Sequence, residues 1–349
     1  MEPSSQVILR NEARLGPGSL LLVNPPGDKL FQHLHSAERP VRISTQHFGD
    51  FRCLSAAGAN ASFDVTPDPD RDIETIILFL PREKERLVMM LHALSSWIPE
   101  KAKLWLIGEN KAGIKSAGRY LKQFFHQVRK LDTARHCALF EALDAKKDRP
   151  FDISSYMNSW RLETGDNPIS VVSLPGVFAH GRLDKGSRLL LDSLSKMKPE
   201  GKILDFACGS GLLGCSLLAE SADLELTLLD VSALAMESSR LTLEENALEA
   251  TLLPSDGLSE LHGRYDWIIS NPPFHRGISN DLQIAAIFFS AVGTFLAKNG
   301  RIVIVCNRHL PYKRWLQEYF EQVTQLDENA EFLIIQASKP RIHQMSKHQ

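Results

Sequence analysis

The second half of the chain alternates short apolar runs with longer segments in which apolar residues recur every three or four positions. The short runs predict buried strands at 202–206, 224–230, 250–253, 265–270, 301–306 and 332–337. The longer segments predict helices at 212–220, 232–246 and 281–297, with Ser232 as the N-cap of the second. Such alternation gives a doubly wound, mostly parallel α/β sheet, which binds ligands at the carboxyl ends of its strands.

The first half of the chain repeats part of this pattern. Residues 73–81 (IETIILFLP) resemble residues 265–273 (YDWIISNPP) in their order of apolar and polar positions. Each segment precedes a helix-length stretch and then another expected strand, at 101–110 and 298–307 respectively. We therefore predict two tandem Rossmann-like α/β domains that arose by duplication.

The first copy lacks the polar residues that stand at strand ends in the second. In this alignment Phe79 takes the place of Asn271, and residues 20–28 contain no closely spaced glycines. The tripeptide at 24–26 (Asn-Pro-Pro) follows a different strand and is expected to form a turn. We expect the first copy to be degenerate. The expected domains are 1–150 and 151–349, and the polar stretch 144–150 is the expected linker.

Composition is that of an ordinary soluble protein, and the scattered cysteines indicate a reducing cytoplasm. Apolar residues make up 43% and charged residues 23%, and the longest apolar runs, such as 302–306, are too short to span a bilayer. The N-terminus has no basic region followed by an apolar one, so secretion is not indicated. The five cysteines form no CxxC pair, so we expect neither a disulfide framework nor a metal site. We also expect a monomer.

Charge is unevenly distributed along the chain. The net charge is −2, but residues 1–150 contain 22 Lys and Arg against 18 Asp and Glu, which leaves −6 for the rest. Residues 101–135 hold nine basic residues against Glu109 and Asp132. Such a cluster indicates either phosphate contacts or a solvated face. The candidate RNA contacts are Lys111, Lys115, Arg119, Lys122, Arg129 and Lys130.

The segment 203–211 (ILDFACGSG) is typical of a strand that ends in a glycine-rich turn before a helix. The turn and the helix N-terminus offer backbone N–H groups to a ligand. Gly209, Gly211 and Gly214 also satisfy the dinucleotide pattern GxGxxG, so an NAD site stays open as an alternative. Asp205 lies where it can bind an amino-acid ammonium, and the turn suits a carboxylate rather than a pyrophosphate. These two features favour S-adenosylmethionine.

Two further carboxylates follow the next strands. Asp230 ends the second strand, 21 residues after Gly209, where it can accept hydrogen bonds from ribose hydroxyls. Asp256 follows the third strand and is either an acceptor for the adenine amino group or a solvated turn residue. Within the expected donor site we also place Ala207, Cys208 and Val231.

A second motif, Asn271-Pro272-Pro273-Phe274, ends the fourth strand. The side-chain oxygen of Asn271 and the carbonyl of Pro272 can accept hydrogen bonds from an exocyclic amino group. They would hold its nitrogen in line with a donor methyl and offset the charge that develops. The prolines fix φ, and Phe274 offers a stacking face for a base. This motif predicts methyl transfer to an amino group.

The chain resembles the bacterial ribosomal RNA small-subunit methyltransferase C family. The matching segments are 108–110 (GEN), 174–178 (LPGVF), 183–184 (LD), 186–187 (GS), 230–232 (DVS), 268–275 (IISNPPFH) and 310–312 (LPY). The resemblance implies two class I methyltransferase domains with an inactive first copy, and methylation of guanine N2 at position 1207 of 16S rRNA. It implies that residues 178–187 border the donor pocket, with Asp184 nearby, and we count Asp184 and Asn271 among the expected donor-binding residues. Ala207 stands where the family has glycine, so its methyl should narrow the loop slightly.

Several alternatives stay open at this point. Asn-Pro-Pro-aromatic motifs also serve adenine N6 in DNA, guanine N2 in 23S rRNA and protein glutamine. An NAD-dependent oxidoreductase and a non-catalytic RNA-binding protein are the alternatives from other classes. His180, His275 and Cys208 have no catalytic partner at an interpretable spacing, so we expect pocket or structural roles for them.

Overall fold

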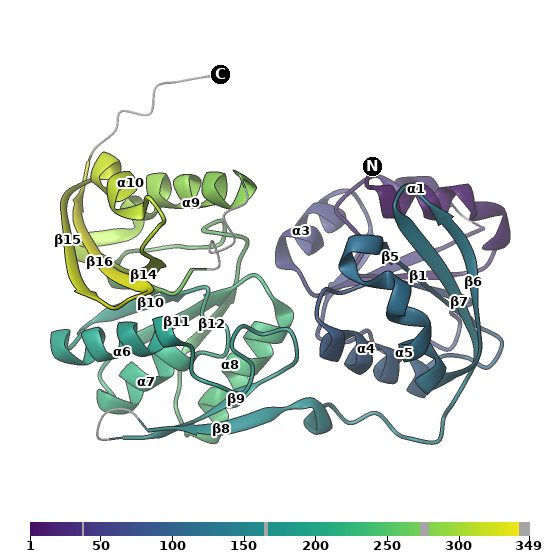
Figure 1. Cartoon of the computed structure of the whole chain (residues 1–349), viewed down its shortest axis with the longest axis horizontal. Helices are drawn as coiled ribbons and strands as arrows, with labels where there is room; N and C mark the ends of the chain where they lie inside the picture. The colour runs from purple at the N-terminus through teal and green to yellow at the C-terminus, as the bar shows by residue number, and fades with distance from the viewer. Residues whose placement is uncertain (37, 164–166, 273–278, 342–349) are drawn as a thin grey trace. The chain divides into compact units, whose positions relative to one another are not determined.

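The computed structural model describes residues 1–36, 38–163, 167–272 and 279–341, and of 279–284 the backbone alone. The chain forms two compact units, residues 1–157 and 158–349 (Figure 1). Within the described residues, no helix is both long and apolar enough to cross a bilayer.

The first unit is a seven-stranded sheet with the strand order β3-β2-β1-β4-β5-β7-β6. Its strands are β1 (Leu20–Val23), β2 (Val41–Thr45), β3 (Asn60–Phe63), β4 (Thr75–Phe79), β5 (Lys103–Glu109), β6 (Phe125–Ala134) and β7 (Cys137–Ala145). Its helices are α1 (Pro3–Arg10), α2 (Leu30–Leu34), α3 (Phe48–Ala56), α4 (Lys84–Trp97) and α5 (Ala117–Phe124). Strands β1 to β5 pair in parallel, and the hairpin β6–β7 joins them antiparallel.

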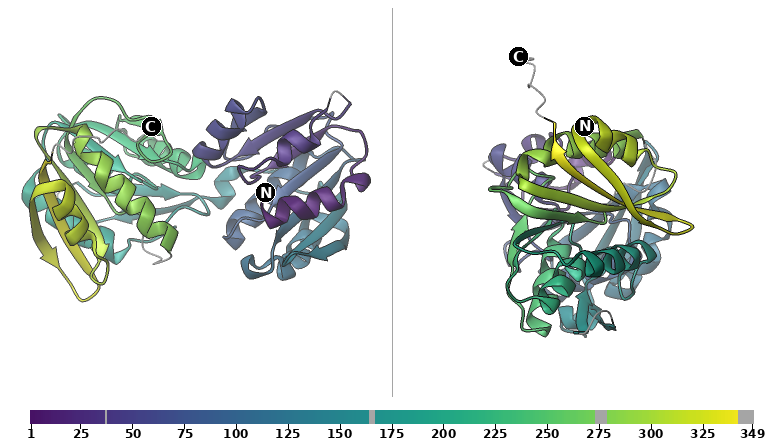
Figure 2. Two further views of the ribbon diagram at one scale, coloured as in Figure 1. Left: turned by 90° about the horizontal axis from the view of Figure 1, so that it is seen from above. Right: turned by 90° about the vertical axis from the view of Figure 1, so that its left-hand side faces the viewer.

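The second unit has the same topology, β12-β11-β10-β13-β14-β16-β15. The strands of this sheet are β10 (Lys202–Phe206), β11 (Glu225–Asp230), β12 (Thr251–Pro254), β13 (Tyr265–Ser270), β14 (Leu296–Asn307), β15 (Phe320–Glu328) and β16 (Phe332–Pro340). Its helices are α6 (Lys185–Met197), α7 (Leu212–Glu220), α8 (Ala233–Glu245), α9 (Ser279–Val292) and α10 (Tyr312–Tyr319). A separate two-stranded sheet consists of β8 (Asn158–Leu162) and β9 (Ile169–Ser173). The antiparallel hairpin β15–β16 forms one edge of the main sheet (Figure 2).

Helices cover both faces of each sheet, so each unit has two apolar layers. In the second unit, one layer includes residues of α6, α7 and α8, and the other includes residues of α9 and α10. In the first unit, α4 and α5 cover one face, and α1, α2 and α3 cover the other. Both sheets are therefore buried on both faces, which explains why their central strands are uninterrupted apolar runs.

Strand register confirms the duplication residue by residue. Leu20 pairs with Thr75 in the first unit as Ile203 pairs with Trp267 in the second. Extending this register along each strand aligns Leu22 with Asp205, Thr45 with Asp230, and Phe79 with Asn271. The first unit thus has apolar or uncharged residues where the second has its strand-end acids and amide. The tripeptide that begins at Asn24 forms the turn after β1, in the place of the glycine turn after β10.

Some boundaries differ from those expected. Asp144 and Ala145 belong to β7 rather than to a linker, because β7 continues its pairing with β6 to Ala145. The helix expected at 281–297 ends at Val292, and Leu296 already begins β14. Ser232 occupies the N-cap position of α8 but its side chain caps nothing. The edge strand β15 was not predicted because its apolar residues, Phe320, Val323 and Leu326, are three apart and form neither an apolar run nor a strand-like alternation.

Candidate active site

The candidate site lies in the second unit, at the carboxyl ends of β10, β11, β12 and β13. These strands are neighbours in the sheet and run parallel, so their last residues and the loops that follow come together. After β10 the backbone turns through left-handed conformations at Ala207, Gly209 and Gly211, with φ of 58°, 60° and 73°. Gly211 then occupies the N-cap position of α7, so the N–H groups of the first helical turn face the strand ends.

Asp205 lies at the end of β10 and is completely buried. Its Oδ2 accepts a hydrogen bond from the N–H of Gly214 at 3.0 Å, but its Oδ1 is buried without a partner. Burial raises the pKa of Asp205 to about 7; the Gly214 bond opposes this rise in part, and the nearby charge of Asp230 adds to it. A buried carboxylate oxygen without a partner is costly unless a ligand supplies one. Asp205 therefore suits the ammonium group of an amino-acid ligand.

Asp230 ties the glycine turn to the start of α8. Its Oδ2 accepts a hydrogen bond from the N–H of Gly209, and its Oδ1 accepts one from the N–H of Ser232, each at 3.0 Å. Each carboxylate oxygen accepts more than one hydrogen bond, so these contacts are compatible with binding ribose hydroxyls as well. Val231 is half-buried beside it.

Ala207 and Cys208 contribute to the turn rather than to chemistry. The methyl group of Ala207 packs against the apolar layer that includes Phe206 and Leu229. The effect of alanine here is therefore mainly a left-handed φ, which costs an L residue about 1 kcal/mol. Cys208 is buried, and this burial raises the pKa of its thiol well above the ordinary value. The thiol stays protonated at neutral pH, which excludes a nucleophilic role.

Asp256 is exposed, two residues beyond the end of β12. The neighbouring N–H of Ser255 donates to the carbonyl of Asp230 at 3.0 Å, which places this loop beside the end of β11. Asp256 thus stands at the same end of the sheet as Asp205 and Asp230.

Asn271 directly follows β13, beside the end of β10. Its side-chain NH₂ group is bonded to the N-cap residue and the first turn of α6. Its Nδ2 donates to Oδ2 of Asp184 at 3.1 Å and to Oγ of Ser187 at 2.9 Å. A carboxylate only accepts hydrogen bonds, so the group that faces Asp184 must be the NH₂, and Oδ1 points to the other side of the amide. The family resemblance placed Asp184 near the donor and did not foresee this contact across 87 positions.

The loop between β9 and α6, residues 174–184, connects the glycine turn with this amide. Val177 is buried over the turn, 3.8 Å from where a side chain on Gly209 would begin. Phe178 is 61% exposed, which is unusual for a large apolar side chain among the described residues. His180 bonds through Nδ1 to Oγ of Ser173 at 2.9 Å, and that hydroxyl also accepts from the N–H of Gly181. His180 therefore shapes this loop.

A row of polar residues on α8 and at its C-cap, which was not predicted from the sequence, holds β9 and the start of that loop. The side chains of Ser238, Thr242 and Asn246 accept hydrogen bonds from the N–H groups of Leu174, Val172 and Ser170. Four residues of a helix and two residues of a strand both advance by roughly 6 Å, so each polar side chain meets one backbone N–H of the strand. The sequence signal for this contact is the spacing of four between these polar residues.

Only the first part of the motif 271–274 lies within the described residues. Pro272 is buried. Pro273, Phe274 and His275 lie outside the described residues. Among the described residues, no group of His, Cys, Asp and Glu side chains could hold a metal ion.

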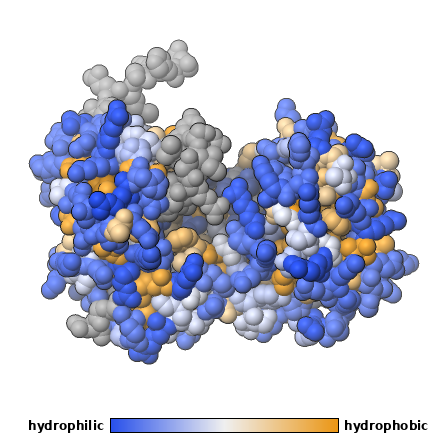
Figure 3. Space-filling model, in the orientation of Figure 1, coloured by the Kyte–Doolittle hydropathy of each residue, from blue (hydrophilic) through white to orange (hydrophobic). Residues whose placement is uncertain are grey.

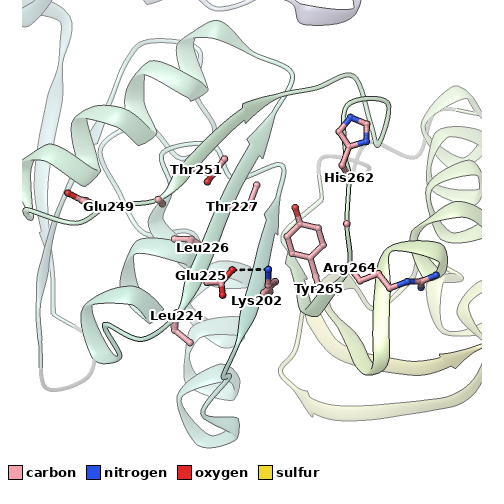
Figure 4. Close-up of a pocket in the computed structure, with 12 residues that line it drawn as sticks. Lys202, Leu224, Glu225, Leu226, Thr227, Glu249, Thr251, His262, Arg264 and Tyr265 are labelled. Atoms are coloured by element: carbon pink, nitrogen blue, oxygen red, sulfur yellow. Dashed lines mark ion pairs between the residues drawn. The ribbon is translucent and has the colours of Figure 1, made fainter.

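A hollow at the other end of the sheet is not this site. It is lined by Lys202, Glu225, Thr251 and Tyr265, which are the first residues of β10, β11, β12 and β13 (Figure 4). Ligands of doubly wound sheets bind at the opposite, carboxyl ends. Lys202 and Glu225 also neutralise each other there, with Nζ 3.0 Å from Oε2.

The predicted basic cluster in the first unit is divided between two faces. Arg129 on β6 pairs with buried Glu141, which also accepts from the indole of Trp105 on the α1 face. Lys130 lies over the ring of Phe140 on the α5 face. Lys115, Arg119 and Lys122 are exposed on or just before α5, and Lys111 pairs with Glu109 at 2.9 Å. Hydrophilic residues predominate on the face drawn in Figure 3.

Each unit matches the model of a known protein family. Residues 5–160 match the family "Methyltransferase small domain N-terminal", and residues 168–336 match "Methyltransferase small domain". Curated relatives named ribosomal RNA small subunit methyltransferase C include one from Pseudoalteromonas atlantica, 36% identical over 96% of this chain and 98% of its own. Another, from Pseudomonas entomophila, is 39% identical over 90% of this chain and 92% of its own.

Among solved structures, the T. thermophilus 16S rRNA N2 G1207 methyltransferase in complex with AdoMet and guanosine has the same fold. The TM-score is 0.84 at 24% identity, with 97% of this chain and 92% of that chain covered. This likeness extends over both units.

Proposed function

The chain belongs to the ribosomal RNA small subunit methyltransferase C family, and from this premise we propose that it methylates N2 of guanine 1207 in 16S rRNA with S-adenosyl-L-methionine as donor. The observation that carries this proposal is the placement of Asn271. Its amide is fixed beside the end of β10, where Asp205 and the glycine turn provide for a cationic amino-acid ligand.

Residues at four neighbouring strand ends would hold the donor. Asp205 takes its ammonium, and the N–H groups after Gly209 and Gly211 take its carboxylate. Asp230 takes the ribose hydroxyls, and Asp256 the adenine amino group. Ala207, Cys208 and Val231 shape the walls, and Asp184 supports the site through Asn271. The buried, unpartnered Oδ1 of Asp205 is the structural feature that most specifically fits a cationic ligand.

The chemistry requires positioning more than acid–base catalysis. The bound donor supplies an electrophilic methyl group on a sulfonium. Oδ1 of Asn271 and the carbonyl oxygen of Pro272 accept hydrogen bonds from the two N–H groups of the target amine. They hold the nitrogen in line for attack and stabilise the positive charge that it acquires. A C–N bond forms as the C–S bond breaks, and the methylated amine then loses one proton to water. Pro273 and Phe274 lie outside the described residues, and from the sequence we assign them to fixing φ and to stacking on the guanine.

We assign RNA contact to the first unit, because its active-site positions are apolar or uncharged. The exposed residues Lys115, Arg119, Lys122 and Lys130 are the contacts that the structure favours from the predicted set. Arg129 and Lys111 contribute less, because Glu141 and Glu109 already neutralise them.

Product mapping tests the substrate. The protein is incubated with labelled donor and, in turn, with small ribosomal subunits, naked 16S rRNA, 23S rRNA, DNA and bulk protein. We expect label in 16S rRNA alone, and mass spectrometry of the digested RNA should locate it as N2-methylguanine at 1207. Label at an adenine, in DNA or on glutamine would replace the proposal with one of the other amino-methyl transfers. Binding of NAD rather than donor would indicate an oxidoreductase.

Substitution tests the assigned chemistry. Asn271→Ala should lower the turnover number about a hundredfold, because one acceptor for the transition-state amine is lost. Methyl transfer to 16S rRNA is measured at saturating donor, with Asn167→Ala, an exposed asparagine of the same unit, as the control. Full activity of the Asn271 variant would refute the role of this amide.

A further inference from the structure

The side-chain amide of Asn271 can serve the proposed reaction in only one of its two orientations. Its oxygen accepts hydrogen bonds, whereas its nitrogen only donates them. A target amine must donate its N–H groups so that its lone pair faces the methyl carbon. If the amide rotated by half a turn, two donors would face each other at the reacting nitrogen.

Contacts behind Asn271 select the useful orientation. Nδ2 lies 3.1 Å from Oδ2 of Asp184 and 2.9 Å from Oγ of Ser187. The carboxylate of Asp184 has no proton to offer an amide oxygen, so the reversed orientation would place two acceptors together. Ser187 is 8% exposed, so water cannot readily replace its hydroxyl.

The two supporting residues are themselves held by the start of α6. Asp184 is the N-cap of α6, and its Oδ2 also accepts the N–H of Ser187 at 3.0 Å. One carboxylate oxygen thus fixes the first helical turn and the amide of Asn271 together. A regular helix is a more rigid support than a loop.

We propose that Asp184 and Ser187 are positioning residues for methyl transfer, an inference that rests on the proposed function. Asp184 selects the orientation of the Asn271 amide, and Ser187, whose hydroxyl can donate or accept, fixes its position. The negative charge of Asp184, bonded to the NH₂ group, also pushes electron density toward Oδ1 and strengthens it as an acceptor. Neither residue touches the reacting atoms.

Two substitutions test this without removing the helix cap. Ser187→Ala deletes the hydroxyl but keeps the backbone N–H that Asp184 caps. Asp184→Asn keeps a side chain that caps equally well but loses the charge and the strict acceptor character. We expect each to lower the turnover number for 16S rRNA about ten- to a hundredfold, the scale of losses from small misplacements. Affinity for S-adenosylhomocysteine should stay within about twofold of the unsubstituted protein, because the structure bonds both side chains to the amide of Asn271.

A substitution that removes the N-cap of a different helix provides the matched control. Asp152 caps a short 3₁₀ helix in the first unit, where its Oδ1 accepts from the N–H of Ser154 at 2.9 Å. Asp152→Ala should change thermal stability alone. Unchanged turnover in both Ser187→Ala and Asp184→Asn would overturn the inference, as would losses that appear in donor affinity rather than in turnover.

A double-substitution cycle separates positioning from general structural damage. In the Asn271→Ala background, Ser187→Ala and Asp184→Asn should have no further effect on the single-turnover rate, because the amide that they orient is gone. Additive losses would overturn the inference. Loss of activity in Asn271→Ala with none in the other two variants would refute this inference alone, whereas full activity of Asn271→Ala would refute the proposed function.

Discussion

At the scale of single residues, Asp205 links ligand binding to pH. Its folded-state pKa of about 7 lies above the ordinary range for aspartate, because burial and the charge of Asp230 disfavour ionisation. The unfolded chain therefore holds fewer protons at this group between about pH 4 and 7. As the pH rises through this window the contribution of Asp205 to folding stability falls, and above about 7 the protein without donor carries an uncompensated buried charge.

Affinity for the donor should show the opposite pH dependence and rise as the pH rises toward 7. An ammonium group requires the ionised carboxylate, so affinity for S-adenosylhomocysteine should fall up to tenfold per pH unit below about 7 and level off above it. Calorimetric titration from pH 5.5 to 8.5, in two buffers of different ionisation enthalpy, would show proton release on binding near pH 6. Asp205→Asn should bind weakly with no such release. An affinity of the unsubstituted protein that is constant across this range would contradict the role of Asp205.

At the scale of elements, close packing of α7 against β11 keeps the glycine turn in place. A side chain begun on Gly214 would lie 2.6 Å from Cδ2 of Leu228 and 2.9 Å from Cδ1 of Leu226. Both leucines are buried, so either their side chains would have to repack or α7 would have to move away from the sheet. Gly214 also supplies the N–H that binds Asp205. The third glycine of this segment therefore serves helix–strand packing.

Gly214→Ala should lower the free energy of unfolding by about 1–3 kcal/mol, the usual cost of overpacking, and should weaken donor binding. Gly118 in α5 is the matched control, because a side chain there would meet Phe140 at an ordinary 3.4 Å. Gly118→Ala should stabilise its unit by about 0.5–1 kcal/mol through helix propensity. Urea unfolding measures the free energy of unfolding of both variants. Equal stability of the two variants would show that α7 has room at Gly214.

At the scale of the whole molecule, the two units share one fold but differ in the residues at their strand ends. The two sheets share strand order and register, yet Leu22, Thr45 and Phe79 stand where the second unit has its acids and amide. A leucine cannot bind an ammonium group, and a phenylalanine cannot accept from an amine. The first unit keeps the architecture without the chemistry.

Donor binding should therefore protect only one unit. Hydrogen exchange measured with and without S-adenosylhomocysteine should slow in peptides from residues 203–214, 228–233 and 268–272, and stay unchanged in residues 1–157. The equivalent peptides of the first unit, around β1, β2 and β4, are internal controls. Protection there by S-adenosylhomocysteine would mean that the first unit also binds donor.

The sequence by itself determined the strands of the main sheet of the second unit other than β15, together with the glycine turn and the strand-end residues. Apolar runs and closely spaced glycines are local properties, and parallel strands necessarily bring their carboxyl ends together. This rule alone groups Asp205, Asp230, Asp256 and Asn271 at one edge of the sheet. The sequence also showed that Phe79 occupies the place of Asn271, because the duplicated segments could be compared directly.

Only the tertiary structure decided which groups orient those residues. Asp184 and Ser187 meet Asn271 across more than eighty positions, and Thr242 of α8 bonds Val172 of β9 across 70 positions. It also separated Arg129 from Lys130, because neighbouring residues on a strand face opposite sides of a sheet. Hydrogen bonds act over about 3 Å whatever the distance along the chain, so local periodicity carries no record of such pairs.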